Sequence, residues 1–142
     1  MKAMLYILLS VTLLASACKK EDESCHKTIK IVNQSDKSIY VECTYGHPDT
    51  AYFVYEPNPA LSPEMYKVSS GETNSRALWS RNCWETNFEV YLPSDTLMIY
   101  VFDAQVLETT PWDTVKANYL VLKRYDLSLQ DLEKMDWTIT YP

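Results

Sequence analysis

Short stretches in which apolar and polar residues alternate are the feature that most restricts the fold of this 142-residue chain. The clearest are Thr28–Val32, Ser38–Tyr45, Phe88–Leu92 and Trp137–Tyr141. Successive side chains of a strand point to opposite faces, so this alternation predicts strands, and no long segment has helical periodicity. Seven or eight such strands, spaced about 8–15 residues apart, predict a mainly all-β, antiparallel β-sandwich-like single domain.

The local pattern also predicts individual elements. Residues 28–33 and 37–45 are expected to form a hairpin around the turn residues 33–36. Leu97–Phe102 is apolar on both faces, which predicts a central strand covered on both sides. Further strands are expected at Ala51–Tyr55, Tyr66–Val68 and Tyr119–Tyr125, with a helical turn around 77–79 and short helices from Thr110 and from Ser128 to about Met135.

The composition is that of a globular protein and excludes several classes. Hydrophobic residues make up 46% and charged residues 23% of the chain, which excludes wholesale disorder, collagen and coiled coil. The 13 Lys and Arg against 19 Asp and Glu give a net charge of −6, which argues against nucleic acid as a partner. Gly46 and Gly71 are the only glycines, which excludes glycine-rich phosphate loops.

The first 17 residues have the pattern of a secretory signal peptide. Lys2 precedes the apolar run Met4–Ala15, which is shorter than the roughly 20 residues that a membrane-spanning helix needs. The small residues 15–17 come directly before Cys18 and resemble the lipobox of bacterial lipoproteins, although Ala15 stands where that pattern prefers Leu. The resemblance implies that Cys18 is acylated and becomes the first residue of the mature protein; the alternative is an ordinary cleaved signal with an incidental Cys18.

Residues 18–25 are expected to be a lipidated cysteine and a charged tether, followed by one β-rich domain over residues 26–142. The tether contains Lys19–Lys20 and then three acids, Glu21–Glu23, with no apolar side chain that could pack. Acids so close to the acylated cysteine resemble the export tag of Bacteroidales-type lipoproteins. The tag implies an outer-membrane protein that faces the cell surface; with an ordinary charged linker it would face the periplasm.

The remaining cysteines are Cys25, Cys43 and Cys83. Export places them in an oxidising compartment, where a disulfide is permitted. Cys25–Cys43 and Cys43–Cys83 are both possible, as is the absence of any bridge, and the sequence does not choose. The spacings of 18 and 40 residues do not suit a metal site, so no metal or other cofactor is expected.

Six segments of the chain, which together extend over most of the mature protein, carry a further resemblance: residues 33–37, 47–50, 97–104, 110–115, 121–127 and 137–142. They resemble a family of small Bacteroidales-type surface lipoproteins. The resemblance implies an envelope location and an all-β fold, and it implies no activity and no functional residues.

Residue types that carry catalysis are sparse, and no enzyme is predicted. The histidines are His26, which lies next to the tether, and His47, which lies in a turn with Pro48 and Asp49. A solvated turn is expected at His47 in preference to a metal site with Asp49. Carboxylate pairs can be imagined among the 19 acids, but nothing marks the candidates Glu85, Glu89, Asp103 and Glu108.

The 11 Tyr and 4 Trp have two possible interpretations. Aromatic residues alternating with Val and Ile are ordinary core residues of strands, and this is expected for Trp79, Trp84, Trp112 and Trp137. An exposed aromatic row would instead form a glycan-binding surface.

The sequence therefore predicts a membrane-anchored, non-catalytic interaction or structural module. A glycan-binding accessory lipoprotein is the alternative, and a small envelope enzyme or inhibitor is less favoured. Another envelope protein is the other expected partner.

Three threonines follow Asp and precede an aliphatic residue. This pattern at Thr50, Thr96 and Thr114 resembles the O-glycosylation sequon of exported Bacteroidales proteins. Each lies at an expected turn or helix start, where a glycan would be solvated. Asp and Thr also favour turns for backbone reasons, so the pattern has an alternative explanation.

Overall fold

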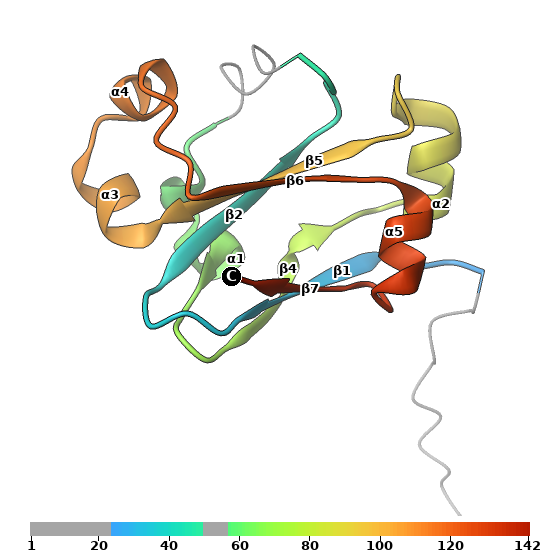
Figure 1. Ribbon diagram of the computed structural model, residues 1–142, viewed down its shortest axis with the longest axis horizontal. Coiled ribbons are helices and arrows are strands. Elements are labelled where there is room, and N and C mark those ends of the chain that lie inside the picture. The colour runs from blue at the N-terminus through green and yellow to red at the C-terminus, as the bar shows by residue number, and fades with distance from the viewer. Residues whose placement is uncertain (1–23, 50–56) are drawn as a thin grey trace, which may run out of the picture.

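The computed structural model describes residues 24–49 and 57–142, which form two β-sheets with short helices at both ends (Figure 1). The three-stranded sheet has the order β4-β1-β7 and contains β1 (Thr28–Asn33), β4 (Thr73–Trp79) and β7 (Thr138–Tyr141). The four-stranded sheet has the order β3-β2-β5-β6 and contains β2 (Ile39–Thr44), β3 (Lys67–Val68), β5 (Leu97–Asp103) and β6 (Lys123–Leu127).

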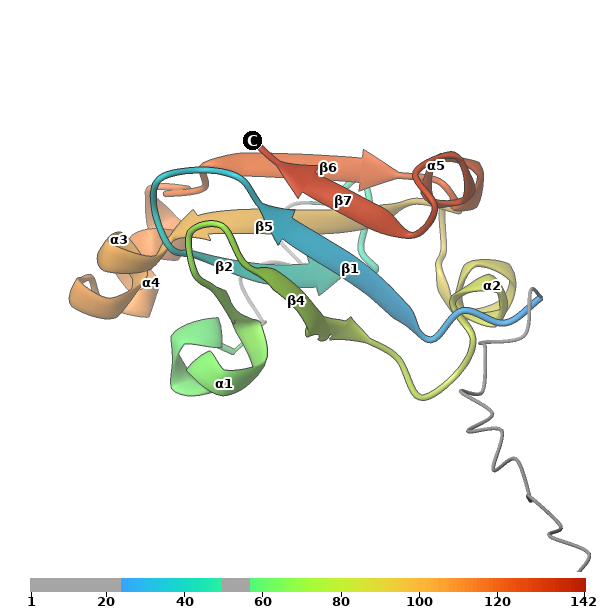
Figure 2. The same cartoon turned by 90° about the horizontal axis from the view of Figure 1, so that it is seen from below.

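The helices gather at two opposite ends of the sheets (Figures 1 and 2). At one end are α3 (Ala104–Thr109) and α4 (Trp112–Ala117). At the other end are α2 (Trp84–Thr86), the π-helical turn η3 (Asn87–Tyr91) that continues it, and α5 (Leu129–Lys134). The turn η2 (Pro59–Leu61) and α1 (Pro63–Tyr66) come before β3.

The predicted mainly β, sandwich-like fold is confirmed. One apolar layer lies between the two sheets and includes Ile29, Ile31, Val41, Ile99 and Ile139. A second layer covers the other face of the four-stranded sheet and joins Tyr40, Tyr100 and Phe102 to Leu107 and Val115 of the helices. Strand β5 contributes to both layers, and all six residues Leu97–Phe102 are buried, as its two-sided apolar pattern predicts.

The expected hairpin of residues 28–33 and 37–45 is wrong. Strand β1 pairs with β4 in antiparallel and with β7 in parallel orientation, whereas β2 pairs with β3 and β5. The turn after β1 instead carries the chain from one sheet to the other. The buried Asn33 side chain holds this crossing: its Nδ2 donates to the carbonyl oxygens of Lys37, Val68 and Ser69 at 2.7, 3.1 and 3.2 Å.

Three other local predictions need correction. Residues 88–92 are largely helical, because Phe88 and Leu92, four residues apart, are both buried on one helical face while Val90 is 62% exposed. Residues 77–79 belong to strand β4, where Leu78 pairs with Ile29 in the core. In the segment expected to be a strand from Tyr119, the strand begins only at Lys123.

The helix starts near Thr110 and at Ser128 are confirmed to within a residue. Helix α5 begins with the predicted capping box, in which Ser128 Oγ accepts from the Asp131 N–H and Asp131 Oδ2 accepts from the Ser128 N–H. The expected strand at 51–55 lies outside the described residues. Across residues 24–49 and 57–142, no helix is long and apolar enough to cross a membrane.

Candidate functional site

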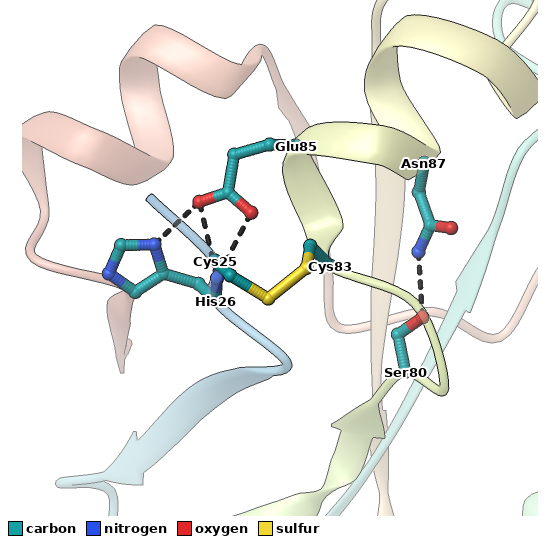
Figure 3. The surroundings of a disulfide bond; sticks show 6 residues. All are labelled: Cys25, His26, Ser80, Cys83, Glu85 and Asn87. Carbon is teal, nitrogen blue, oxygen red and sulfur yellow. Dashed lines mark hydrogen bonds and ion pairs between the residues drawn. A yellow bond between two sulfur atoms is a disulfide. The ribbon is translucent and has the colours of Figure 1, made fainter. Parts of the chain in front are cut away.

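The described chain begins beside α2, where a disulfide joins Cys25 to Cys83 with 5.0 Å between their Cα atoms (Figure 3). This pairing is neither of the two considered possible from the sequence, Cys25–Cys43 and Cys43–Cys83, and the third alternative, no bridge, is also not what the structure has. Cys25 precedes β1 and Cys83 follows β4, and the hydrogen bonds between these two segments continue past the ladder: Ser80 N donates to Lys27 O and Trp84 N to His26 O. Cys43 lies on β2 in the other sheet and packs against the core.

The carboxylate of Glu85 holds His26, the residue that follows Cys25. Glu85 accepts a hydrogen bond from the His26 backbone N–H at 3.0 Å, and its Oε1 lies 2.6 Å from His26 Nδ1 (Figure 3). The imidazole also stacks on Trp137, with 4.2 Å between the ring centroids. Backbone, ring and disulfide thus fix the start of the domain at three points.

The helical turn that carries Glu85 is itself fixed by hydrogen bonds to the end of β4 and the loop after it. Trp84 is 1% exposed, and its Nε1 donates to Leu78 O at 3.2 Å. Asn87 Nδ2 donates to Ser80 Oγ at 2.8 Å, closing the loop between β4 and α2 (Figure 3). Because both anchors are buried or half-buried, Glu85 projects from a fixed turn.

A cleft of about 590 Å³ opens beside this turn, between α2–η3 and the first turn of α5. Phe88 and Leu129 give it an apolar floor, and Glu85, Glu89 and Asp95 give it an acidic rim. Its other lining residues are Ser128 and Gln130, so among the described residues that line it none is Lys, Arg or His. The cleft combines apolar surface with the carboxylates of Glu89 and Asp95, while the third rim carboxylate, Glu85, bonds to His26.

The α5 side of the cleft is set by the capping box. Ser128 Oγ and N–H both bond to the Asp131 carboxylate, and these hydrogen bonds lower the pKa of Asp131. The Ser128 hydroxyl is therefore engaged in capping the start of α5, and the ordered first turn places Leu129 and Gln130 along the cleft.

The opposite end of the molecule holds a second group of charges, which neutralise one another. Glu108 accepts from Lys67 Nζ at 2.7 Å and from the Tyr40 hydroxyl at 2.9 Å. Burial and then the Glu108 carboxylate raise the pKa of Tyr40 to about 12. Lys67 and Glu108 line a cleft of about 340 Å³ together with Lys37 and Asp103.

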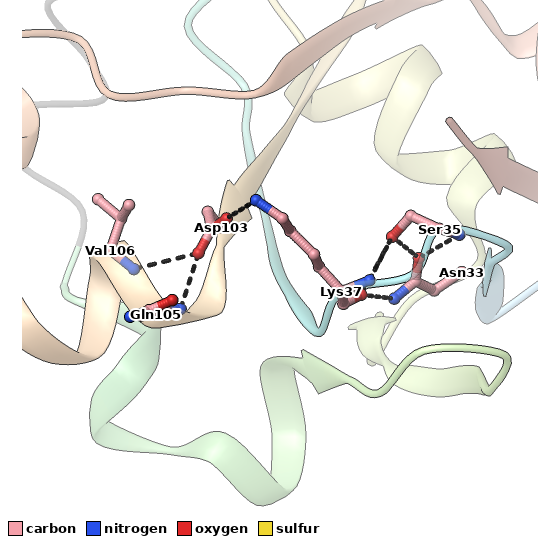
Figure 4. A network of polar contacts seen from close by, with 6 residues as sticks. All are labelled: Asn33, Ser35, Lys37, Asp103, Gln105 and Val106. Atoms are coloured by element: carbon pink, nitrogen blue, oxygen red, sulfur yellow. Dashed lines mark hydrogen bonds and ion pairs between the residues drawn. The ribbon is translucent and has the colours of Figure 1, made fainter.

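Asp103 links this group to the crossing between the sheets (Figure 4). Its carboxylate accepts from Lys37 Nζ at 3.3 Å and from the N–H groups of Gln105 and Val106, so it also caps α3. Burial alone would raise the pKa of Asp103, but the hydrogen bonds from Val106, Lys37 and Gln105 lower it. This end is a satisfied structural network, since its cations and carboxylates already bond to each other.

The histidines and acids considered from sequence are dispersed. His47 Nδ1 lies 3.2 Å from Ser94 Oγ, in a turn. Glu85 and Glu89 line the cleft beside α5, whereas Asp103 and Glu108 line the one beside α3. In residues 24–49 and 57–142, no three His, Cys, Asp or Glu side chains come close enough together to hold a metal ion.

The tryptophans only partly follow the core prediction. Trp84 and Trp137 are buried, and Trp112 packs against the second apolar layer, but Trp79 is 59% exposed on β4. The other exposed aromatics in the described chain, Tyr91 and Tyr119, lie on η3 and on the loop after α4. They come from separate elements and form no row on one sheet face.

The candidate glycosylation sites differ in their surroundings. Thr114 is exposed on α4, whereas Thr96 is half-buried and its hydroxyl donates to Ser94 O at 3.1 Å; Thr50 lies outside the described residues.

We expect a glycan at Thr114 rather than at Thr96. Thr114→Ala should remove the added mass from the native protein, and Thr96→Ala should leave it, because Thr114 is exposed whereas Thr96 is half-buried and its hydroxyl bonds to Ser94 O. Intact-mass spectrometry of both variants, produced in the native host, checks this. An unchanged mass in Thr114→Ala would contradict it.

Comparison of the chain with protein-family models, with curated proteins and with solved structures gives no match.

Proposed function

We propose that this protein is an exported lipoprotein of the outer membrane, anchored through Cys18, whose folded domain is a non-catalytic interaction module facing the cell surface. The Cys25–Cys83 disulfide is the observation that carries the proposal. Disulfides persist in oxidising compartments and are rare in the cytosol, which agrees with the signal-peptide pattern of residues 1–17.

The position of the disulfide suits an anchored domain. Cys25 is seven residues after Cys18, and a chain of that length reaches at most about 25 Å. Two or three acyl chains on one cysteine give stable attachment, because each buried CH₂ contributes about 0.8 kcal/mol. The tether therefore ends where three contacts hold the start of the domain: the disulfide, the Glu85 hydrogen bond and the Trp137 ring.

Binding is favoured over catalysis by the state of the polar side chains. His26 Nδ1 is occupied by Glu85, and the Ser128 hydroxyl is occupied by its capping box. A general base acts on a nucleophile within hydrogen-bond reach, and among the described residues no hydroxyl or thiol bonds to the His26 ring, while Ser128 bonds to Asp131 and not to a histidine. The cleft beside α5 therefore suits recognition.

A glycan-binding accessory lipoprotein is the second candidate, favoured by a cleft beside the start of α4. It has a volume of about 450 Å³ and combines Trp112 with the polar side chains of Asn58, Glu108 and Thr110. An aromatic ring with several hydrogen-bonding groups is a suitable lining for a sugar. A glycan array probed with the full-length protein separates this candidate from a protein-binding module.

The anchor is tested by Cys18→Ser, with Cys43→Ser as the matched control. A serine at position 18 cannot be acylated as the cysteine is, so we expect the variant to lose labelled palmitate and to leave the membrane fraction. Cys43→Ser should keep both, since Cys43 lies within the folded domain. If Cys18→Ser still takes up palmitate and stays in the membrane fraction, the proposed anchor is wrong. The surface orientation has its own test, which is labelling of intact cells with an amine reagent that does not cross membranes. If that reagent does not label the protein, the domain does not face the cell surface.

A further inference from the structure

The cleft between α2–η3 and α5 has the size and lining of a ligand site. Its volume of about 590 Å³ lies within the range of roughly 300–1,000 Å³ that is usual for such sites. Phe88 and Leu129 form apolar surface inside it, and two short helical segments define its walls.

Two carboxylates at the rim are unused by the fold. Glu85 is committed to His26, but within the described residues neither Glu89 nor Asp95 has a hydrogen-bond or ion-pair partner for its carboxylate. This differs from the opposite end of the domain, where Lys67 neutralises Glu108 and Lys37 neutralises Asp103. The cleft therefore offers negative charge that a ligand can satisfy.

Apolar surface continues from the acidic rim. Val90 and Tyr91, which follow Glu89 directly in η3, are 62% and 55% exposed. An occupant that matches this surface has a cationic group next to an apolar body. An anionic membrane surface does not match, because like charges repel across the rim and across a chain of net charge −6.

We propose that this cleft binds a basic segment of a partner protein, in which an arginine side chain flanked by an aliphatic residue lies over the apolar surface at Leu129 and Phe88 and pairs with Glu89 and Asp95. Arginine is favoured over lysine because its planar guanidinium is weakly hydrated and pairs with carboxylates in a fork. The inference gives the proposed interaction module a location and a partner chemistry. The evidence for this binding site comes from the cleft and does not depend on the lipid anchor. Palmitate labelling therefore tests the anchor, peptide binding tests the cleft, and either result can be negative without the other.

The direct test titrates the full-length protein, purified in a neutral detergent, with an acetylated and amidated leucine–arginine–leucine peptide by isothermal calorimetry. Replacing the arginine by citrulline keeps its shape and removes its charge, and should weaken binding about tenfold or more. Raising NaCl from about 50 to about 500 mM should also weaken binding, because the rim charges are solvent-exposed. Equal affinity of the citrulline peptide, or of arginine amide without its apolar neighbours, would overturn the proposal.

The rim is tested with two variants that change the net charge equally. Glu89→Gln with Asp95→Asn removes the two unused carboxylates, and asparagine suits position 95, where Asp95 has φ 50°. Asp36→Asn with Glu72→Gln removes two exposed acids from the turns after β1 and before β4. The first pair should weaken peptide binding about tenfold and the second should leave it unchanged. If the two pairs weaken peptide binding equally, the attraction comes from the net charge of the protein and not from this cleft, and the proposed site is wrong.

The occupied space is tested with two matched tryptophan substitutions. Gln130 and Gln105 are both exposed at the second position of a six-residue helix, but only Gln130 lines this cleft. Gln130→Trp should block peptide binding while every carboxylate remains, and Gln105→Trp should not affect it. Full binding by Gln130→Trp would show that the peptide binds elsewhere.

Discussion

Replacing Cys25 and Cys83 together by serine is expected to lower the free energy of unfolding by about 4 kcal/mol. The bridge spans 58 residues, a segment that contains β1, β2, β3 and β4. Closing a loop of that length removes much of the conformational freedom of the unfolded chain, which is the main source of the stabilisation. A loss of this size is a large part of the stability of a typical domain.

The measurement is urea denaturation of the variant and its parent, both carrying Cys18→Ser so that no detergent is needed. Cys43→Ser is the matched control, because it removes a thiol that lies outside the bridge. A lower midpoint without a lower slope would indicate lost stability rather than a changed native state. A loss of unfolding free energy below about 1 kcal/mol would contradict the prediction. It would mean that the contacts of His26 with Glu85 and Trp137 hold the start of the domain in place without the disulfide.

Elements with a complete local signal could be predicted from the sequence. Ser128 and Asp131 contain both halves of a capping box within four residues, so the start of α5 follows from them alone. Leu97–Phe102 is apolar at every position, which only a strand covered on both faces accommodates. In both cases the stabilising partners are adjacent in sequence or are required by the composition of the segment itself.

The segment 88–92 shows where alternation is ambiguous. Phe88 and Leu92 share a face in a strand, because they are an even number of residues apart, and in a helix, because they are four apart. Val90 distinguishes the two structures: it would be buried in the strand, and it is exposed in η3. The deciding contacts come from Trp84 and Asn87, which fix the preceding turn through Leu78 and Ser80.

The candidate site depended on information that no local pattern carries. Cys25 and Cys83 come together only because β1 pairs with β4, and the expected hairpin with β2 directed attention to Cys43 instead. The cleft likewise joins residues 85–95 to residues 128–130. Each half looks like an ordinary charged surface, and the contrast between apolar floor and unpaired acids arises only when the two halves meet.

The crossing at Asn33 explains why β1 and β2 enter different sheets and leads to the second large effect. Asn33→Asp is expected to cost about 3 kcal/mol or more at pH 7. The native amide donates to three carbonyl oxygens from a fully buried position, while its own oxygen accepts from the Ser35 N–H and hydroxyl. A carboxylate has no N–H, so it would place a buried negative charge against those carbonyls.

The same substitution should make stability depend on pH. The carbonyls and the burial disfavour ionisation, so the pKa of the new carboxyl in the folded state lies above its unfolded value of about 3.9. The folded state then holds the proton more tightly, and the loss relative to the parent should be smallest below about pH 4 and should grow as pH rises through the folded pKa. Urea denaturation at several pH values measures this, with Asn82→Asp at an exposed position as the control. A loss that does not change with pH would mean that residue 33 does not face the three carbonyls, and the link between the two sheets would then lie elsewhere in the turn.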